Sequence, residues 1–128
     1  MAQFNKTLSN NSQYRLELVV NQGSQSIPNN TSRVSWTLRV RKLSGSGYWS
    51  GYTSNWSVNI GGVKRSGSIS SYDFRNYTVL TLGSGTVTIT HDSDGTKSIT
   101  SSGTWTEPAN LGNATASGEF KKSVLNAK

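Results

Sequence analysis

The acidic residues and the single histidine are the natural starting point for any catalytic chemistry in this chain. It contains six acidic residues, one histidine and no cysteine. A serine-type catalytic triad needs a histidine that a carboxylate orients beside a serine. Asp92 adjoins His91, but neighbouring residues of a strand point to opposite faces, and no nucleophile-elbow motif is present. We therefore predict no catalytic residues and a protein that is not an enzyme.

The segment 92–95, Asp-Ser-Asp-Gly, resembles the start of a calcium-binding loop. A complete loop also needs further oxygen ligands and a bidentate glutamate near its end. Lys97 follows instead, and the next glutamate along the chain is Glu107. Aspartate and glycine are common in tight turns, because aspartate bonds to nearby backbone N–H groups and glycine adopts positive φ. We interpret the segment as a hairpin turn, and we predict neither a metal nor a cofactor.

Three aromatic residues, Tyr48, Trp49 and Tyr52, lie in a segment rich in glycine and serine. Aromatic rings on such a rim can stack on sugar faces or fill pockets of a partner protein. The same rings would also suit a strand pair that covers one end of the core. Both alternatives stay open, and we take the three residues as a candidate site for a partner or a glycan.

The chain carries a net charge of +7, with 13 basic residues that are spread along its length. Nucleic-acid binders usually cluster their cations with exposed aromatic residues, so the sequence does not favour a nucleic-acid partner. The one dense basic run is residues 39–42, Arg-Val-Arg-Lys. Arg39, Arg41 and Lys42 are therefore a candidate contact with an acidic protein surface. The alternative is an ordinary strand face in solvent.

The absence of cysteine excludes disulfides and thiolate metal sites, so packing or oligomerisation must stabilise the domain. No apolar run approaches the roughly 20 residues that a membrane-spanning helix needs. The first six residues lack the apolar core of a secretion signal. We expect no association with a membrane.

Apolar and polar side chains alternate along several short segments, and no helical period is present. The clearest apolar positions, each two residues from the next within its segment, are Tyr14, Leu16, Leu18, Val20, Val34, Trp36, Leu38, Val40, Trp56, Val58 and Ile60. A period of two puts such side chains on one face of a strand, and we expect those of Val34, Trp36, Leu38, Trp56, Val58 and Ile60 to be buried. About eight short strands separated by turn signals predict an antiparallel β-sandwich, either immunoglobulin-like or jelly-roll-like.

Glycines 61 and 62 predict a two-residue hairpin turn, because both can adopt the positive φ of a type I′ turn. The hairpin would pair Ile60 with Val63 and Trp56 with Gly67, which leaves room for the indole beside the glycine. Pro and Gly signals further predict a loop over residues 21–32 and a strand that ends at Gly83.

The chain divides into three parts in this interpretation. Residues 1–12 are polar and predict a loose N-terminal arm, which would become ordered against a neighbour. Residues 13–122 form the single β-sandwich domain, and residues 123–128 form a C-terminal tail. Tyr72 and Phe74 are two apart, so we expect them to share one face at an aromatic corner.

Five segments, taken in order, carry a resemblance to a known family. They are residues 27–36, 56–62, 71–75, 91–97 and 111–114. Together they are similar to the immunoglobulin-like β-sandwich modules of siphophage virion proteins, which occur in tail-associated and minor structural proteins of phages of Gram-positive hosts. The resemblance covers residues 14–120 and carries over no catalytic residues.

The resemblance implies a non-enzymatic virion structural protein, assembled in the cytoplasm of the bacterial host. Because the chain begins with Met1 and ends soon after its last predicted strand, we expect a complete small gene product, such as an outer decoration protein or minor protein of capsid or tail. Its partners would be the major capsid or tail protein and further copies of itself, with a trimer expected first and a dimer second. The alternative is a carbohydrate-binding module that adheres to a host cell-wall glycan through the aromatic residues of 48–52.

Overall fold

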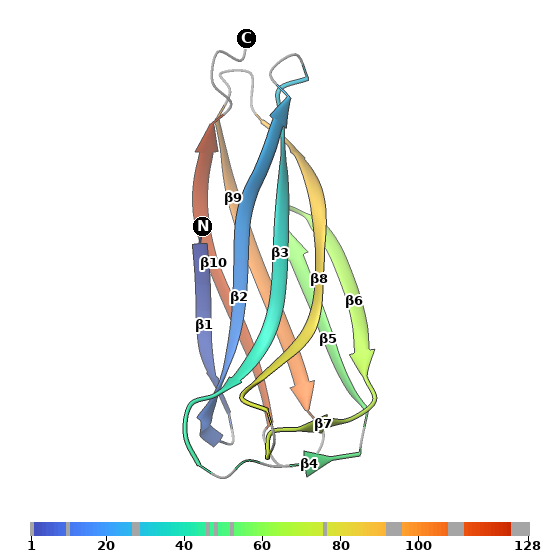
Figure 1. Ribbon diagram of the computed structural model, residues 1–128. Coiled ribbons are helices and arrows are strands. Elements are labelled where there is room, and N and C mark those ends of the chain that lie inside the picture. Colours follow the sequence, from blue (N-terminus) through green and yellow to red (C-terminus); the bar gives the residue numbers. More distant parts are fainter. Residues whose placement is uncertain are drawn as a thin grey trace.

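The computed structural model describes residues 2–9, 11–26, 29–45, 47, 49–51, 53–75, 77–91, 96–107 and 112–123. These described residues form ten strands: β1 (Ala2–Leu8), β2 (Asn11–Ser26), β3 (Thr31–Lys42), β4 (Trp49–Ser50), β5 (Ser54–Ile60), β6 (Val63–Ile69), β7 (Tyr72–Asp73), β8 (Val79–Thr90), β9 (Thr96–Glu107) and β10 (Gly112–Ser123). Eight of them form two antiparallel sheets, in the orders β1-β2-β3-β8 and β10-β9-β5-β6. Strands β4 and β7 pair at one end of the molecule, at the bottom of Figure 1. This architecture confirms the predicted antiparallel β-sandwich.

The core lies between the two sheets and follows from the alternation of apolar residues. In β2 and β3 the inward-facing side chains are at most 3% exposed: Tyr14, Leu16, Leu18, Val20, Val34, Trp36, Leu38 and Val40. The second sheet contributes Val58, Ile60, Ile99 and Trp105, which are equally buried. Within the first sheet, Leu18 lies directly opposite Leu38 in the register of β2 and β3, so the inward-facing side chains of these two strands lie side by side. Apolar burial of this kind is the main force that holds two sheets together.

Trp56 is half-buried rather than buried, which corrects the expectation of a fully enclosed ring. Its ring packs against Trp36 with the ring centroids 5.7 Å apart. A Cβ at Gly67 or Gly83 would stand 2.6 Å or 2.4 Å from the indole, so the ring occupies the space that both glycines leave. Gly67 belongs to the edge strand β6 and has no side chain to cover the ring, which leaves part of the indole exposed.

The predicted strand end at Gly83 is wrong, because β8 continues through Gly83 and Gly85 as far as Thr90. A Cβ at Gly85 would lie 3.1 Å from Trp36, so these glycines admit tryptophan rings from within the core instead of turning the chain. The predicted loop over residues 21–32 is also shorter than expected. Strand β2 extends to Ser26, with an irregular register between residues 22 and 25.

The hairpin of β5 and β6 confirms the predicted turn. Gly61 and Gly62 have φ angles of 58° and 94°, both in the left-handed region. Ile60 pairs with Val63 and Trp56 lies opposite Gly67, as the two-residue loop requires. The amide of Gly62 also donates a hydrogen bond of 2.9 Å to the Oδ1 atom of Asn59, which closes the turn.

The polar segment at the N-terminus forms the edge strand β1, so the prediction of a loose arm is wrong for residues 2–8. It pairs with β2 from Ala2 opposite Val20 onward. Phe4 packs partly buried against the core, and a Cβ at Gly118 of β10 would stand 2.2 Å from its ring. An edge strand with one face in solvent suits a polar composition, which is why residues 1–12 gave no strand signal.

Four aromatic rings fill the core near β7 and contact one another in series. Tyr14 and Phe74, Phe74 and Tyr72, and Tyr72 and Trp105 have centroid separations of 4.8, 5.4 and 5.8 Å. The indole nitrogen of Trp105 donates a hydrogen bond of 2.9 Å to the buried Oγ of Ser54. Tyr72 and Phe74 are both buried, which confirms the expected aromatic corner.

Candidate functional site

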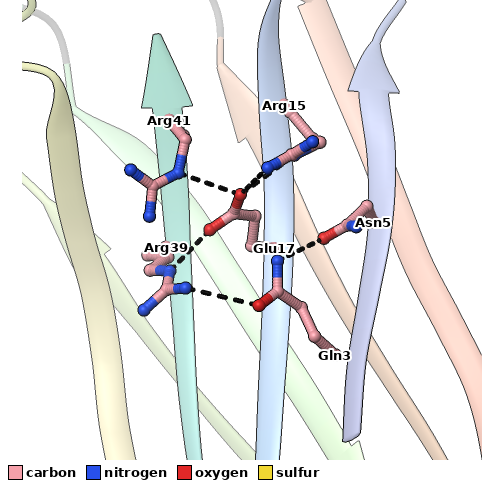
Figure 2. Close-up of polar contacts among 6 residues, drawn as sticks. All are labelled: Gln3, Asn5, Arg15, Glu17, Arg39 and Arg41. Atoms are coloured by element: carbon pink, nitrogen blue, oxygen red, sulfur yellow. Dashed lines mark hydrogen bonds and ion pairs between the residues drawn. The ribbon is translucent and has the colours of Figure 1, made fainter. Parts of the chain in front are cut away.

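Three arginines surround the carboxylate of Glu17 on the outer face of the first sheet, as Figure 2 shows. Arg15 and Glu17 are two residues apart on β2, and Arg39 and Arg41 are two apart on β3. The register puts Glu17 opposite Arg39 and Arg15 opposite Arg41. Because a strand repeats every two residues, all four side chains emerge on the same face. We call these four residues the arginine cluster.

Every oxygen of the Glu17 carboxylate accepts from an arginine. Arg39 Nε donates to Oε1 over 2.6 Å, and Arg41 Nε donates to Oε2 over 3.0 Å. Arg15 donates to Oε2 through Nε at 2.9 Å and through Nη2. The cluster continues to β1, where Gln3 accepts from Arg39 and donates to the side chain of Asn5. The result is a hydrogen-bonded layer across three strands (Figure 2).

Glu17 is 0% exposed, whereas the arginine side chains are 27–35% exposed. Burial alone would raise the pKa of the Glu17 carboxyl, because it disfavours the charged form. Hydrogen bonds from Arg39, Arg15 and Arg41 outweigh that effect and lower the pKa to about 2. Glu17 is therefore ionised across the physiological pH range, and it holds the three guanidinium groups in fixed positions.

The cluster leaves two positive charges in excess, since three guanidinium groups meet one carboxylate. Each guanidinium has five N–H donors, so donors remain for a partner on the exposed side. Planar guanidinium groups match carboxylates in a two-point geometry that lysine does not offer. The arrangement is chemically suited to bind a carboxylate-bearing surface.

The structure separates Lys42 from Arg39 and Arg41, the other two residues of the predicted basic contact. Arg39 and Arg41 lie in the cluster, as their strand period suggests, but Lys42 does not. Lys42 Nζ donates a hydrogen bond of 2.7 Å to the backbone carbonyl of Phe74, so it anchors the aromatic corner instead. Sequence reasoning missed Glu17 and Arg15. Arg15 and Glu17 are two residues apart, as are Arg39 and Arg41, and this spacing could have indicated the cluster. It can be recognised only when the pairing of β2 with β3 is known.

The predicted aromatic site lies almost wholly outside the described residues. Tyr48 and Tyr52 are both beyond them, and only the backbone of Trp49 is described, as the first residue of β4. Trp49 pairs with Asp73 of β7. The glycan and partner interpretations of these three residues therefore stay predictions.

The single histidine is engaged with a serine inside the protein. Ser32 Oγ and His91 Nε2 are 2.6 Å apart, and the two residues are 1% and 4% exposed. The backbone of His91 is bonded to Asn30 in both directions, its amide to the Asn30 carbonyl and its carbonyl to the Asn30 side chain. This pair joins the start of β3 to the end of β8 and is buried in the core.

The predicted turn at residues 92–95 lies outside the described residues. Among the residues that are described, no group of three or more His, Cys, Asp and Glu side chains could hold a metal ion. In the same part of the chain, no helix is long and apolar enough to cross a membrane.

The fold and the cluster define a β-sandwich protein with a preorganised cationic sheet face. A family model described as siphovirus protein of unknown function (DUF859) matches residues 1–114. The chain therefore belongs to this family of siphovirus proteins. Searches of curated proteins and of solved structures found no match. The predicted resemblance to siphophage proteins is confirmed at the level of this family, and the match reaches the N-terminal residues that the resemblance had left out.

Proposed function

We propose that this protein is a non-enzymatic structural component of the siphovirus particle, an outer decoration or minor protein of the capsid or tail. In this proposal it resides in the virion and docks through the outer face of the β1-β2-β3-β8 sheet. The membership of the chain in a siphovirus family supports the viral setting. The observation that carries the docking face is the arginine cluster, with its three partly exposed guanidinium groups.

The buried carboxylate makes the cluster more effective as a docking surface than three separate arginines. A free arginine side chain loses rotamer freedom when it is immobilised at an interface, which weakens binding. Glu17 fixes the guanidinium groups of Arg15, Arg39 and Arg41 before any partner arrives. Groups fixed in advance lose less entropy on binding, so more of the electrostatic attraction appears as affinity. Their charge also speeds association with an acidic surface and orients it.

The partner in this proposal is the major capsid or tail protein, and the contact is with its carboxylates. Identical subunits usually assemble with closed symmetry, so several copies would bind together, as a trimer in the first instance and otherwise as a dimer. Strand β1 is part of the sheet, which removes the loose arm as the element that crosses to a neighbouring copy. The docking face itself thus becomes the contact to test.

The test is the incorporation of purified protein into particles that lack it. Arg41→Gln removes one charge from the cluster and leaves Arg15 and Arg39 bonded to Glu17. Arg65→Gln on the edge strand of the other sheet removes the same charge and serves as the matched control. We expect Arg41→Gln to weaken incorporation about tenfold, a loss of about 1.4 kcal/mol, while Arg65→Gln incorporates like the wild type.

Two results would count against the proposal. Wild-type protein that does not join the particles would overturn the structural role. Equal losses for Arg41→Gln and Arg65→Gln would show that net charge, rather than the arginine cluster, drives association. Raising the salt concentration gives a second measurement, because exposed charge pairs are screened over about 10 Å at 0.1 M ionic strength.

A further inference from the structure

The outer face of the second sheet has the opposite character to the arginine cluster. Nine positions, in three rows of three across β9, β5 and β6, carry short polar side chains with a single lysine: Thr106, Asn55 and Ser68, then Thr104, Ser57 and Ser66, then Ser102, Asn59 and Lys64. The register aligns each row across the three strands. All nine are exposed or half-buried, whereas their inward neighbours Val58, Ser101 and Trp105 are buried. We call these nine residues the hydroxyl grid.

Two adjoining depressions cover the hydroxyl grid and form one shallow trough. Their volumes are about 530 and 480 Å³, and they share Ser57, Ser66 and Thr104. Volumes of this size are typical of ligand sites, which span about 300–1,000 Å³. Most ligand sites are lined by apolar and aromatic residues. Most of the residues that line this trough are serine, threonine or asparagine, together with Val58, Trp56 and Gly67. An apolar ligand would leave the hydroxyl and amide groups without hydrogen bonds, which disfavours it.

The side chains of the grid fit a polymer of sugars. A serine or threonine hydroxyl both donates and accepts, and an asparagine amide offers two donors and an acceptor, so they can match sugar hydroxyl groups in either sense. These side chains are short and lose little rotamer freedom when they are ordered. Thr104 and Thr115 of the neighbouring β10 already exchange a hydrogen bond of 2.9 Å across the surface. Neighbouring strands lie about 4.8 Å apart, so the rows present regularly spaced polar groups.

Charge at one end of the trough defines the kind of sugar polymer. Lys64 borders the first depression, and no acidic residue is among the described residues that line either one. Arg65 also borders it, but it is the next residue of β6 and lies opposite the inward-facing Val58, so its side chain emerges on the other face. Neither cation forms an ion pair with a carboxylate in the described part of the chain. We propose that the hydroxyl grid binds an acidic polysaccharide, with the sugar hydroxyl groups on the grid and an acidic group at Lys64.

Other macromolecules fit this surface less well. Binding of single-stranded nucleic acid relies on aromatic side chains for base stacking. The one aromatic residue among the described residues that line the trough is Trp56, and its ring packs against Trp36 of the other sheet. Stable protein interfaces are centred on buried aromatic and apolar anchors, which the grid also lacks. The proposed site is separate from residues 48–52, and it lies on the sheet opposite the arginine cluster. One face of the sandwich could thus contact the particle while the other faces a glycan.

The test uses the free, full-length protein and polygalacturonate as the acidic probe, with neutral dextran and double-stranded DNA as comparisons. Titration calorimetry at about 0.15 M salt limits non-specific charge effects. Two pairs of variants separate the site from net charge. Lys64→Gln is matched by Arg33→Gln on the outer face of the first sheet, and Ser66→Tyr, which fills the trough, is matched by Thr88→Tyr on β8.

We expect polygalacturonate to bind, Lys64→Gln to weaken binding about fivefold and Ser66→Tyr to abolish it, with both matched variants unchanged. No binding of polygalacturonate by the wild type would overturn the proposal. Equal losses of affinity for Lys64→Gln and Arg33→Gln would show that net charge, rather than the grid, attracts the polysaccharide. Dextran binding as strong as polygalacturonate binding would show that no acidic group is required. DNA binding that is tighter than polygalacturonate binding and is lost in Ser66→Tyr would show that the ligand is a nucleic acid instead of a polysaccharide. Because particles play no part in this experiment, its failure leaves the docking proposal intact.

Discussion

Replacing Glu17 with glutamine tests the arginine cluster most sharply, because it removes the anion that holds three cations together. Glu17→Gln keeps the size of the side chain but leaves Arg15, Arg39 and Arg41 without a carboxylate. Breaking a fully buried ion pair costs about 3–5 kcal/mol. The guanidinium groups here are about one-third exposed, and water screens them, so we expect a loss of about 2–3 kcal/mol in unfolding free energy at pH 7.

The pH dependence supplies an independent magnitude for the same interaction. The pKa of Glu17 falls from its ordinary value of 4.5 to about 2 in the folded protein. At 1.36 kcal/mol per pKa unit this corresponds to about 3 kcal/mol, which solvent screening of the arginines reduces to about 2 kcal/mol. A lowered carboxyl pKa stabilises the fold above the unfolded value. That stabilisation is present above pH 4.5 and is lost as the pH falls toward 2.

Urea unfolding followed by tryptophan fluorescence, repeated from pH 7 to pH 2, measures both magnitudes. We expect the difference between wild type and Glu17→Gln to shrink from about 2–3 kcal/mol at pH 7 to nearly zero at pH 2. Asp73→Asn is the control, since it breaks the exposed pair with Arg75 at 3.2 Å and should cost no more than about 1 kcal/mol. A difference that stays constant across the pH range, or is absent at pH 7, would refute the coupling of Glu17 to the arginines.

Three further changes test the packing of the sandwich. Gly83→Ala puts a Cβ 2.4 Å from the ring of Trp56, so we expect a loss of about 1–3 kcal/mol, and an unchanged melting temperature would contradict the packing. Deletion of residues 2–8 removes β1, and we expect the melting temperature to fall by roughly 10 °C or more. A truncated protein that melts like the wild type would show that these residues contribute nothing to the stability of the sandwich. Trp105→Phe leaves the buried hydroxyl of Ser54 without its 2.9 Å donor and should cost about 1–2 kcal/mol by urea unfolding, in addition to lost packing; adding Ser54→Ala should recover part of that loss, and no recovery would count against the bond.

Local patterns were sufficient to predict the parts of the fold that depend on neighbouring residues. The alternation in β2 and β3 identified the inward-facing side chains, because a strand has a period of two. The pair Gly61 and Gly62 predicted both the turn and the register of β5 and β6, because a two-residue loop permits one register. Tyr72 and Phe74 were placed correctly for the same local reason.

Features that depend on distant residues could not be predicted in the same way. Gly83 resembles a turn signal locally, and its real role becomes clear only when Trp56 of the other sheet lies against it. The polar strand β1 has one partly buried ring, Phe4, and that ring packs on a strand more than 100 residues away. Glu17 is a charged residue of a kind that is rarely buried, and it is buried here because strand pairing brings Arg39 and Arg41 beside it. For that reason the sequence located two of the cluster's arginines and missed its centre.

A cryo-electron microscopy map of particles of the siphovirus that encodes this chain is the most direct test of the structural role. The account predicts density for the β-sandwich on the outside of the capsid or tail, with the β1-β2-β3-β8 sheet facing the particle and the arginine cluster beside carboxylates of the underlying protein. A particle without the sandwich, or a sandwich docked through its β10-β9-β5-β6 sheet, would contradict it.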